Sequence, residues 1–293
     1  MEIIVAKSAG FCFGVKRAVD TVYRELEKGG ELYTYGPIIH NEEVIRELTE
    51  KGVVIINDKE ELKRLKADPE GVIKKTVIIR SHGAQKEVHD IIRKNGLELV
   101  DATCPFVKKI HKIVREESEK GKQIVIVGNK NHPEVEGIMG WCEGNPIVIE
   151  NREEAEKLRA YRDVPVCVVA QTTFNYKNFQ DLVEIISDCC YDINAVHTIC
   201  SATEQRQTEA LELSKQVDAM LVVGGAKSSN TQKLFEICSG ECNNTYFIQT
   251  AKDLKEKDFS LVSRLGVTAG ASTPNNIIEE ILCYVRINFW RDV

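Results

Sequence analysis

Gly10-Phe11-Cys12-Phe13-Gly14 is the first of three stretches in which a short apolar run ends at a cysteine and a helical pattern begins. The second is Asp101-Ala102-Thr103-Cys104-Pro105, and the third is Ile199-Cys200-Ser201-Ala202-Thr203. The three cysteines are 92 and 96 positions apart, close to a third of the 293-residue chain. A period of this kind indicates an internal repeat.

The order of features after each cysteine is also the same. A second β-rich run ends in a polar loop, a third leads into a charged helical stretch, and a fourth ends in another polar loop. The first loop carries a polar residue 28 positions after each cysteine: His40, His132 and Ser228. The second carries one 70, 68 or 72 positions after its cysteine: His82, Thr172 and Ser272. Strands that alternate with helices predict parallel sheets.

The repeat predicts an α/β fold: a trefoil of three pseudo-repeated α/β domains with short parallel sheets around a central cavity. The domains would span residues 1–96, 97–192 and 193–293, the last with a C-terminal helix and tail. Ligands of parallel sheets collect at the carboxyl ends of the strands. Loops that face a pseudo-threefold axis would therefore share one cavity.

Bulk properties exclude several classes of function. The net charge is −6, and no run of lysine or arginine stands out, so we expect neither nucleic acid nor a membrane surface as a partner. The N-terminal sequence does not read as a signal peptide, and no apolar run is long enough to span a membrane. We expect a cytoplasmic protein, in which ten cysteines would not form a disulfide framework.

The three repeated cysteines predict a soft-metal site. A [4Fe–4S] cluster usually takes four cysteines, so three would leave one iron open as a Lewis acid while the cluster supplies electrons. The alternative is that Cys12, Cys104 and Cys200 are small buried hydrophobes. Most of the other cysteines lie in or beside apolar runs, where a cysteine behaves as a small hydrophobe, and we interpret them as structural. Cys238 and Cys242 have the spacing of a possible ligand pair, but they have no counterpart in the other repeats, so we favour a structural role for them too. The seven other cysteines are Cys142, Cys167, Cys189, Cys190, Cys238, Cys242 and Cys283.

The polar loops carry hydroxyl, imidazole and amide groups with one acid and no lysine or arginine. These residues are His40, His82, His132, Glu134, Thr172, Ser228, Ser229, Asn230 and Ser272. Such groups at helix N-termini suit a phosphate, although each alone could merely cap its helix. Glu134 could supply the proton that loss of a hydroxyl as water requires, or it could be a solvated surface residue. His89, His111 and His197 have no repeat counterparts, and we interpret them as structural.

Taken together, the motifs resemble the 4-hydroxy-3-methylbut-2-enyl diphosphate reductase family over nearly the whole chain. The motifs are Ala9 to Val15, Gly36-Pro37-Ile38-Ile39-His40-Asn41, Arg80-Ser81-His82-Gly83, Asp101 to Pro105, Asn131-His132-Pro133-Glu134, Gln171-Thr172-Thr173, Thr198-Ile199-Cys200, Ala202-Thr203, Arg206-Gln207, Ser228-Ser229-Asn230 and Thr268 to Pro274. One departure is Ser201, where the family tends to carry a larger residue.

The resemblance implies a trefoil fold and the last step of the non-mevalonate isoprenoid pathway, in which the allylic diphosphate is reduced to isopentenyl and dimethylallyl diphosphate. It implies one [4Fe–4S] cluster on Cys12, Cys104 and Cys200, with one iron open to the substrate. His132, Glu134 and Thr172 would lie at the reacting end, with Glu134 as the proton source. His40, His82, Ser228, Ser229, Asn230 and Ser272 would hold the diphosphate. A small carrier such as ferredoxin or flavodoxin would deliver the electrons.

Two other functions stay open from the residues alone. A non-redox iron–sulfur dehydratase could use the open iron only as a Lewis acid, and it would turn over without an electron donor. A binding protein could hold a structural metal on the cysteines and an anion on the hydroxyl loops.

Overall fold

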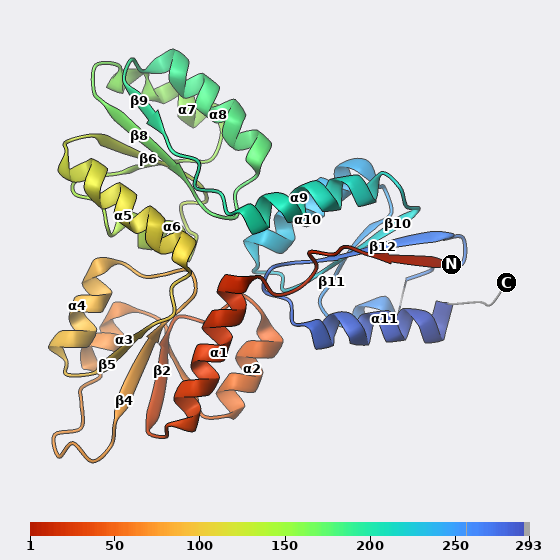
Figure 1. Ribbon diagram of the computed structural model, residues 1–293, viewed down its shortest axis with the longest axis horizontal. Coiled ribbons are helices and arrows are strands. Elements are labelled where there is room, and N and C mark those ends of the chain that lie inside the picture. Colours follow the sequence, from red (N-terminus) through yellow and green to blue (C-terminus); the bar gives the residue numbers. More distant parts are fainter. Residues whose placement is uncertain (256, 290–293) are drawn as a thin grey trace. The chain divides into compact units, whose positions relative to one another are not determined.

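The structure is a computed structural model that describes residues 1–255 and 257–289, and it contains three four-stranded parallel sheets (Figure 1). The chain forms two compact units. The one-sheet unit comprises residues 1–15 and 40–43 and the chain from residue 200 onward. The two-sheet unit comprises residues 16–39 and 44–199.

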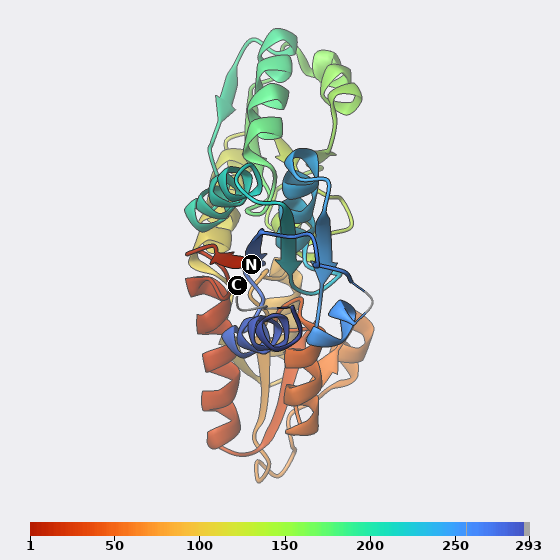
Figure 2. The same cartoon turned by 90° about the vertical axis from the view of Figure 1, so that its right-hand side faces the viewer.

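The sheet of the one-sheet unit has the order β1-β12-β10-β11. Its strands are β1 (Glu2–Val5), β10 (Ala219–Val223), β11 (Thr245–Ile248) and β12 (Arg264–Ala269). Its helices are α9 (Ser201–Ser214), α10 (Ser229–Glu241), the short 3-10 helix η2 (Ala251–Leu254) and α11 (Asn275–Phe289). Figures 1 and 2 show α11 on one side of the strands and α9 with α10 on the other.

Side-chain alternation along β10 explains these two layers. Leu221 packs in one cluster with Ile278 and other residues of α11, whereas Met220 packs in a second cluster with Ala210 of α9 and Leu234 of α10. Successive side chains of a strand point to opposite faces, so a strand covered on both sides needs an unbroken apolar run. All five residues of β10 are buried.

The first sheet of the two-sheet unit has the order β3-β2-β4-β5. Its strands are β2 (Glu31–Tyr35), β3 (Val54–Ile56), β4 (Lys75–Ile79) and β5 (Glu98–Asp101). The helices along this part of the chain are α1 (Phe13–Glu27), α2 (Glu42–Glu50), α3 (Lys59–Arg64) and α4 (Lys86–Lys94). The first residues of α1 and α2 fall in the one-sheet unit.

The second sheet of the two-sheet unit has the order β7-β6-β8-β9. Its strands are β6 (Gln123–Val127), β7 (Ile147–Ile149), β8 (Val166–Ala170) and β9 (Ile193–Ala195). Its helices are α5 (Pro105–Glu119), α6 (Pro133–Met139), α7 (Arg152–Glu156), the 3-10 helix η1 (Lys157–Tyr161) and α8 (Tyr176–Cys189). Apolar clusters lie on both faces of this sheet, and β8 is buried throughout.

The three sheets share one strand order, which confirms the predicted α/β class and the internal repeat. The strand before each cysteine pairs with a strand of another repeat. For β5 and β9 this partner is the strand that precedes them in the chain, from which a helical crossover leads. Thus β5 pairs with β4, β9 pairs with β8, and the N-terminal strand β1 pairs with β12. The sequence interpretation had grouped each of these strands with the repeat that follows it.

The domain limits at 96/97 and 192/193 and the arrangement of the repeats around a central cavity stay predictions. The tail at residues 290–293 lies outside the described residues. Across residues 1–255 and 257–289, no helix has the length and apolar character that crossing a membrane requires.

Candidate active site

All three repeated cysteines stand where a loop enters a helix. Cys104 and Cys200 are the N-cap residues of α5 and α9, and neither side chain makes a capping hydrogen bond. Cys12 directly precedes α1, and its Sγ accepts a weak contact from the Val15 N–H at 3.5 Å. The dipole at a helix N-terminus favours a thiolate, which is the form that binds metal. All three side chains are partly exposed.

Arg206 of α9 connects the two cysteines of the one-sheet unit. Its guanidinium is buried and donates to the Gly10 carbonyl at 2.7 Å, two residues before Cys12. Burial lowers the pKa of Arg206, whereas thiolates at Cys12 and Cys200 would raise it. A buried cation beside two thiols favours an anionic metal–thiolate group, so these residues fit the predicted cluster.

Arg17 of α1 has a similar place in the two-sheet unit. It donates to the carbonyls of Thr103 at 3.0 Å and Ala102 at 3.3 Å, directly before Cys104. The Cys104 N–H in turn donates to the Ser81 carbonyl at 2.9 Å, which ties the cysteine to the loop that carries His82. Arg206 and Arg17 therefore each hold the backbone close to a predicted cluster ligand, Cys12 and Cys104 respectively.

Sequence reasoning missed both arginines as site residues. A signal was present, because Arg17 follows Cys12 by five positions and Arg206 follows Cys200 by six. The equivalent position after Cys104 is Lys109. Repeated cations one and a half turns into each helix would have suggested a role beside the cysteines.

Most of the other cysteines have the surroundings expected of structural thiols. Burial raises the pKa of Cys142 and Cys238 to about 12 and that of Cys167 to about 11, so these thiols stay protonated. Cys189, Cys190 and Cys242 are also buried. The interpretation of Cys283 as a small buried hydrophobe is wrong, because it lies on an exposed position of α11.

Three predicted phosphate-binding residues lie together in the one-sheet unit. The Ser272 hydroxyl donates to the His40 carbonyl at 3.0 Å, and its Oγ lies 3.1 Å from Ser228 Oγ. Ser228 caps α10 by accepting from the Thr231 N–H at 3.3 Å. Gly225 permits this approach, because a Cβ there would meet the His40 carbonyl at 2.8 Å. Ser228 therefore has its predicted capping role and also lies beside Ser272.

Asn230 provides the clearest indication of an anion site. Its Oδ1 accepts from the Ala271 N–H at 2.9 Å, which fixes the amide. Its Nδ2 is buried and has no acceptor among the described residues. A buried donor without an acceptor is costly, and a phosphate oxygen would satisfy it.

The predicted acid lies in the two-sheet unit, within the first turn of α6. Glu134 is 1% exposed, so it is not the solvated surface residue of the alternative interpretation. Its Oε1 accepts from the Thr172 N–H at 2.6 Å, and its Oε2 accepts from the Thr172 hydroxyl at 2.8 Å. Burial raises the pKa of Glu134 to about 7, although both hydrogen bonds oppose that rise. The carboxyl can therefore hold a proton near neutral pH.

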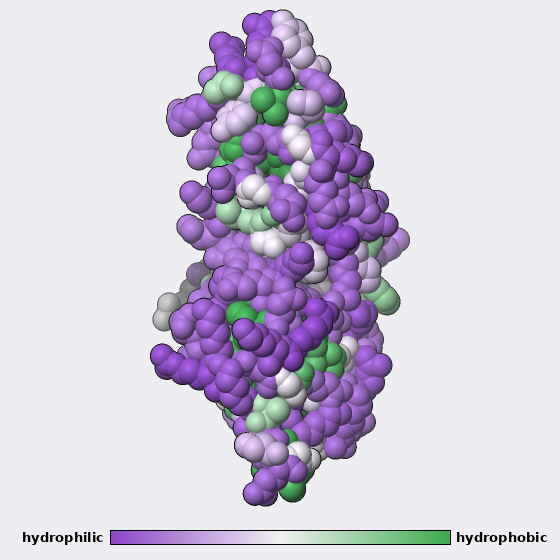
Figure 3. All heavy atoms as spheres, turned by 90° about the vertical axis from the view of Figure 1, so that its left-hand side faces the viewer, coloured by the Kyte–Doolittle hydropathy of each residue, from purple (hydrophilic) through white to green (hydrophobic). Residues whose placement is uncertain are grey.

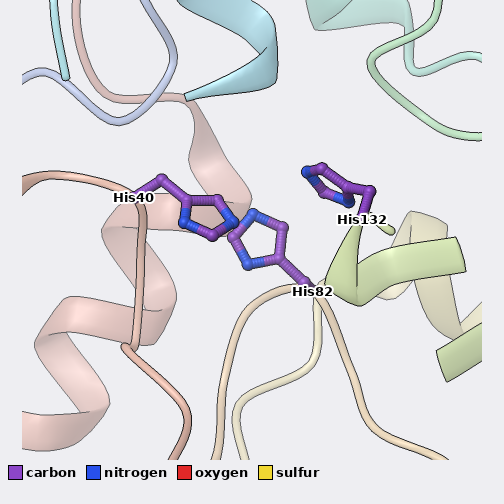
Figure 4. A group of neighbouring side chains, drawn as sticks. All are labelled: His40, His82 and His132. Carbon is purple, nitrogen blue, oxygen red and sulfur yellow. The ribbon is translucent and has the colours of Figure 1, made fainter. Parts of the chain in front are cut away.

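His132 and His82 lie beside this acid on the same unit. His132 is the N-cap of α6, and its Nδ1 accepts from the Glu134 N–H at 3.1 Å, so neutral His132 carries its proton on Nε2. The rings of His82 and His132 meet edge to face with centroids 5.5 Å apart (Figure 4). Figure 4 also labels His40, which belongs to the one-sheet unit. Imidazole N–H groups can donate hydrogen bonds to a polar substrate, and a protonated carboxyl beside them can give it a proton.

The loop that follows His82 contacts the side chains of His111 and Trp141. Gly83 has φ +76°, and a Cβ there would lie 2.6 Å from His111 Cε1. His111 stacks on Trp141 at a centroid distance of 5.3 Å, and the Trp141 indole N–H donates to the Ala84 carbonyl at 2.9 Å. The buried place of His111 agrees with the structural role that the sequence indicated.

The chain is similar to known proteins over nearly its whole length. The LytB protein profile matches residues 3–286. A 4-hydroxy-3-methylbut-2-enyl diphosphate reductase of Caldanaerobacter subterraneus subsp. tengcongensis is 46% identical over 284 residues, covering 96% of each chain. The protein of that name from Clostridioides difficile is 42% identical over 286 residues, covering 97% of this chain and 99% of its own.

The chain is also similar to solved structures of reductases of this kind. A structure described as (E)-4-hydroxy-3-methyl-but-2-enyl diphosphate reductase, the terminal enzyme of the non-mevalonate pathway, is 40% identical, with a TM-score of 0.69 and coverage of 98% of this chain and 100% of its own. The E-1-hydroxy-2-methyl-but-2-enyl-4-diphosphate reductase of Plasmodium falciparum is 27% identical, with a TM-score of 0.89 and coverage of 97% and 88%. The chain therefore belongs to the LytB protein family.

Proposed function

We propose that the chain reduces (E)-4-hydroxy-3-methylbut-2-enyl diphosphate to isopentenyl and dimethylallyl diphosphate, the terminal step of the non-mevalonate pathway. Relatives of 42–46% identity over nearly the full length carry the name of this reductase. The observation that carries the proposal is Glu134, a buried carboxyl with a pKa of about 7 in hydrogen-bond contact with Thr172. Such a group can give a proton to a leaving hydroxyl.

The balance of the reaction defines what the protein must supply. The allylic C–O bond breaks, a C–H bond forms, and the oxygen leaves as water. Two electrons and two protons are consumed for each substrate. The protein therefore needs an electron source, a proton source near the hydroxyl and a site that holds the diphosphate.

Cys12, Cys104 and Cys200 would hold the electron source, one [4Fe–4S] cluster with one iron free of protein ligand. When bound, that cluster would supply the two electrons and a Lewis acid for the substrate oxygen. Arg206 supports this assignment, because its buried charge lies beside Cys12 and Cys200. Arg17 would keep the Cys104 loop in place through the Thr103 carbonyl.

The diphosphate would be held by His40, His82, Ser228, Ser229, Asn230 and Ser272. Asn230 Nδ2, buried and without an acceptor among the described residues, supports this role most directly. The N-terminus of the 13-residue helix α10 adds backbone N–H groups and a favourable dipole. The site would hold its anion through neutral donors, so binding would depend on geometry rather than on net charge.

Glu134 would deliver the proton, with His132 and Thr172 as its partners. Thr172 fixes both carboxyl oxygens, and the Glu134 N–H fixes the His132 ring. A carboxyl with a pKa near the working pH is suited to general acid catalysis. His132 Nε2–H would donate a hydrogen bond to the substrate oxygen.

A small one-electron carrier, ferredoxin or flavodoxin, would reduce the cluster twice in each turnover. We also assign the protein to the cytoplasm, a reducing compartment in which cysteines that bind a metal cluster stay reduced.

Anaerobic purification followed by metal and activity assays tests the proposal. We expect about four iron and four sulfide per chain, together with oxidation of reduced methyl viologen that depends on the allylic diphosphate. Turnover without any reductant would favour the non-redox dehydratase. A chain that holds zinc, or stays inactive after cluster reconstitution, would favour the metal-stabilised anion-binding protein.

A further inference from the structure

The proposed reaction makes no use of a pocket of about 400 Å³ in the two-sheet unit, where α4, β5 and α5 meet. Cations outnumber carboxylates in its lining. The cations are Arg93, Lys108, Lys112 and Arg115, and the carboxylates are Asp101 and Glu116.

The positive charge comes mainly from one helix. The first three turns of α5, residues 105–115, carry Lys108, Lys109, Lys112 and Arg115 and no carboxylate. The side chains of Lys112 and Arg115 are 75% and 49% exposed. They form ion pairs with Glu116 at 3.7 Å and Glu119 at 3.2 Å. Arg93 and Lys108 are paired as well, with Asp90 at 3.5 Å and Asp101 at 2.6 Å. Ion pairs between exposed side chains contribute little and can be exchanged for a partner's charges.

The lining of the pocket includes the residue that precedes a predicted cluster ligand. Thr103 lines the pocket, is buried and directly precedes Cys104. His111 and Trp141 form an aromatic wall beside it. Burial lowers the pKa of His111 to about 3, so this wall stays neutral and leaves the charge of the pocket to the lysines and arginines.

The face around α4 and α5 is also mainly hydrophilic. Figure 3 views the side of the molecule on which these helices lie, and most of the side chains there are polar or charged. A polar surface of this kind suits a transient encounter, in which opposite charges steer two proteins together and water remains between them. A permanent interface would bury a larger apolar area.

We propose that the α5 surface, defined as Arg93, Lys108, Lys112 and Arg115 around Thr103, docks a small acidic one-electron carrier protein. The inference rests on the proposed reductase function and adds the route of the electrons. Each reduced carrier would be oxidised by one electron, and that electron would pass by way of the Thr103–Cys104 backbone to the cluster that Cys104 would help to hold. Two successive encounters would therefore serve one substrate. Short-lived docking allows the oxidised carrier to leave before the second arrives.

The test is a charge-reversed double variant, Lys112→Glu with Arg115→Glu. Its matched control is Arg46→Glu with Lys51→Glu at α2, where side chains of 67% and 48% exposure also pair with glutamates of their own helix. Both variants change the net charge equally. Two assays are run on the anaerobic holoenzyme, one with a reduced acidic 2[4Fe–4S] ferredoxin and one with reduced methyl viologen.

We expect the α5 variant to raise the KM for ferredoxin roughly tenfold or more at low ionic strength, with the control within about twofold of the unsubstituted protein. The difference should disappear near 1 M salt, where the screening length is about 3 Å. Viologen-driven turnover should be equal in all three proteins. Equal ferredoxin KM values in both variants would overturn the docking surface, whereas absence of viologen turnover in the unsubstituted protein would overturn the reductase itself.

Discussion

The two units differ in the polar groups that we propose for the substrate site. In the one-sheet unit, Ser228, Asn230 and Ser272 offer neutral hydroxyl and amide groups around the start of α10. In the two-sheet unit, Glu134 is a buried acid clasped by Thr172. The first set suits an anion that stays unchanged, and the second suits a proton that moves.

Each set of groups would be unsuited to the role that we propose for the other set. A carboxylate among the neutral donors would repel a diphosphate. A lysine or arginine against Glu134 would lower the pKa that burial raises to about 7, and the acid would lose its proton near neutral pH. Because the two kinds of group lie on separate loops, the pKa of the acid and the charge around the anion donors can be set independently.

Removing the proton should have the largest effect. Glu134→Gln keeps an oxygen that can accept from the Thr172 N–H but cannot give up a proton. We expect viologen-driven kcat to fall by about 10²–10⁴ while the KM for the diphosphate changes little, because the variant alters the acid and not the anion donors. Iron and sulfide content should stay at the level of the unsubstituted protein.

The matched control is Glu136→Gln, an exposed glutamate two residues further along α6. Its kcat should stay within about twofold of the original, as is usual for a surface substitution. A kcat for Glu134→Gln close to that of this control would show that another group delivers the proton.

Disrupting the anion donors should produce the complementary change. Asn230→Asp keeps the oxygen that accepts from the Ala271 N–H but replaces the buried Nδ2 donor with a second oxygen. We expect the KM for the diphosphate to rise by about ten- to a hundredfold, since a hydrogen bond to a charged group contributes about 1.5–3 kcal/mol. Asn288→Asp, on the exposed side of α11, is the matched control. A lower kcat with unchanged KM would place Asn230 among the reacting groups.

Much of this division was predictable, because repeat-equivalent positions are visible in sequence. Cys104 and Cys200 at helix N-termini, Ser228 as a helix cap and the alternation of strands and helices all follow from patterns of residue type and spacing. Local chemistry of this kind depends on neighbours in the chain, which a sequence displays directly.

Contacts between distant segments were not predictable. The pairing of β1 with β12 joins strands more than 250 residues apart, and apolar alternation does not name a partner. The hydrogen bond from Arg206 to the Gly10 carbonyl joins residues that are 196 positions apart. The buried state of Glu134 depends on Thr172, 38 positions away, so its raised pKa could not be inferred from His132-Pro133-Glu134 alone.

The smallest expected effect is on stability, and it reports the environment of Glu134 without any substrate. The pKa of Glu134 rises from an ordinary 4.5 to about 7 on folding, so the native state binds more protons than the unfolded state between these values. Stability should therefore fall as pH rises through that window, by up to about 3 kcal/mol at 1.36 kcal/mol per pKa unit.

Glu134→Gln has no carboxyl to ionise at this position, so its stability should not fall in this way. Its melting temperature, measured by calorimetry on anaerobic protein, should exceed that of the unsubstituted chain by on the order of 5 °C at pH 8, and the gap should narrow toward pH 5. Glu136→Gln should show no such pH-dependent gap. A gap of equal size at pH 5 and pH 8 would mean that Glu134 ionises with an ordinary pKa, and the contrast between a proton-holding unit and an anion-holding unit would then lose its physical basis.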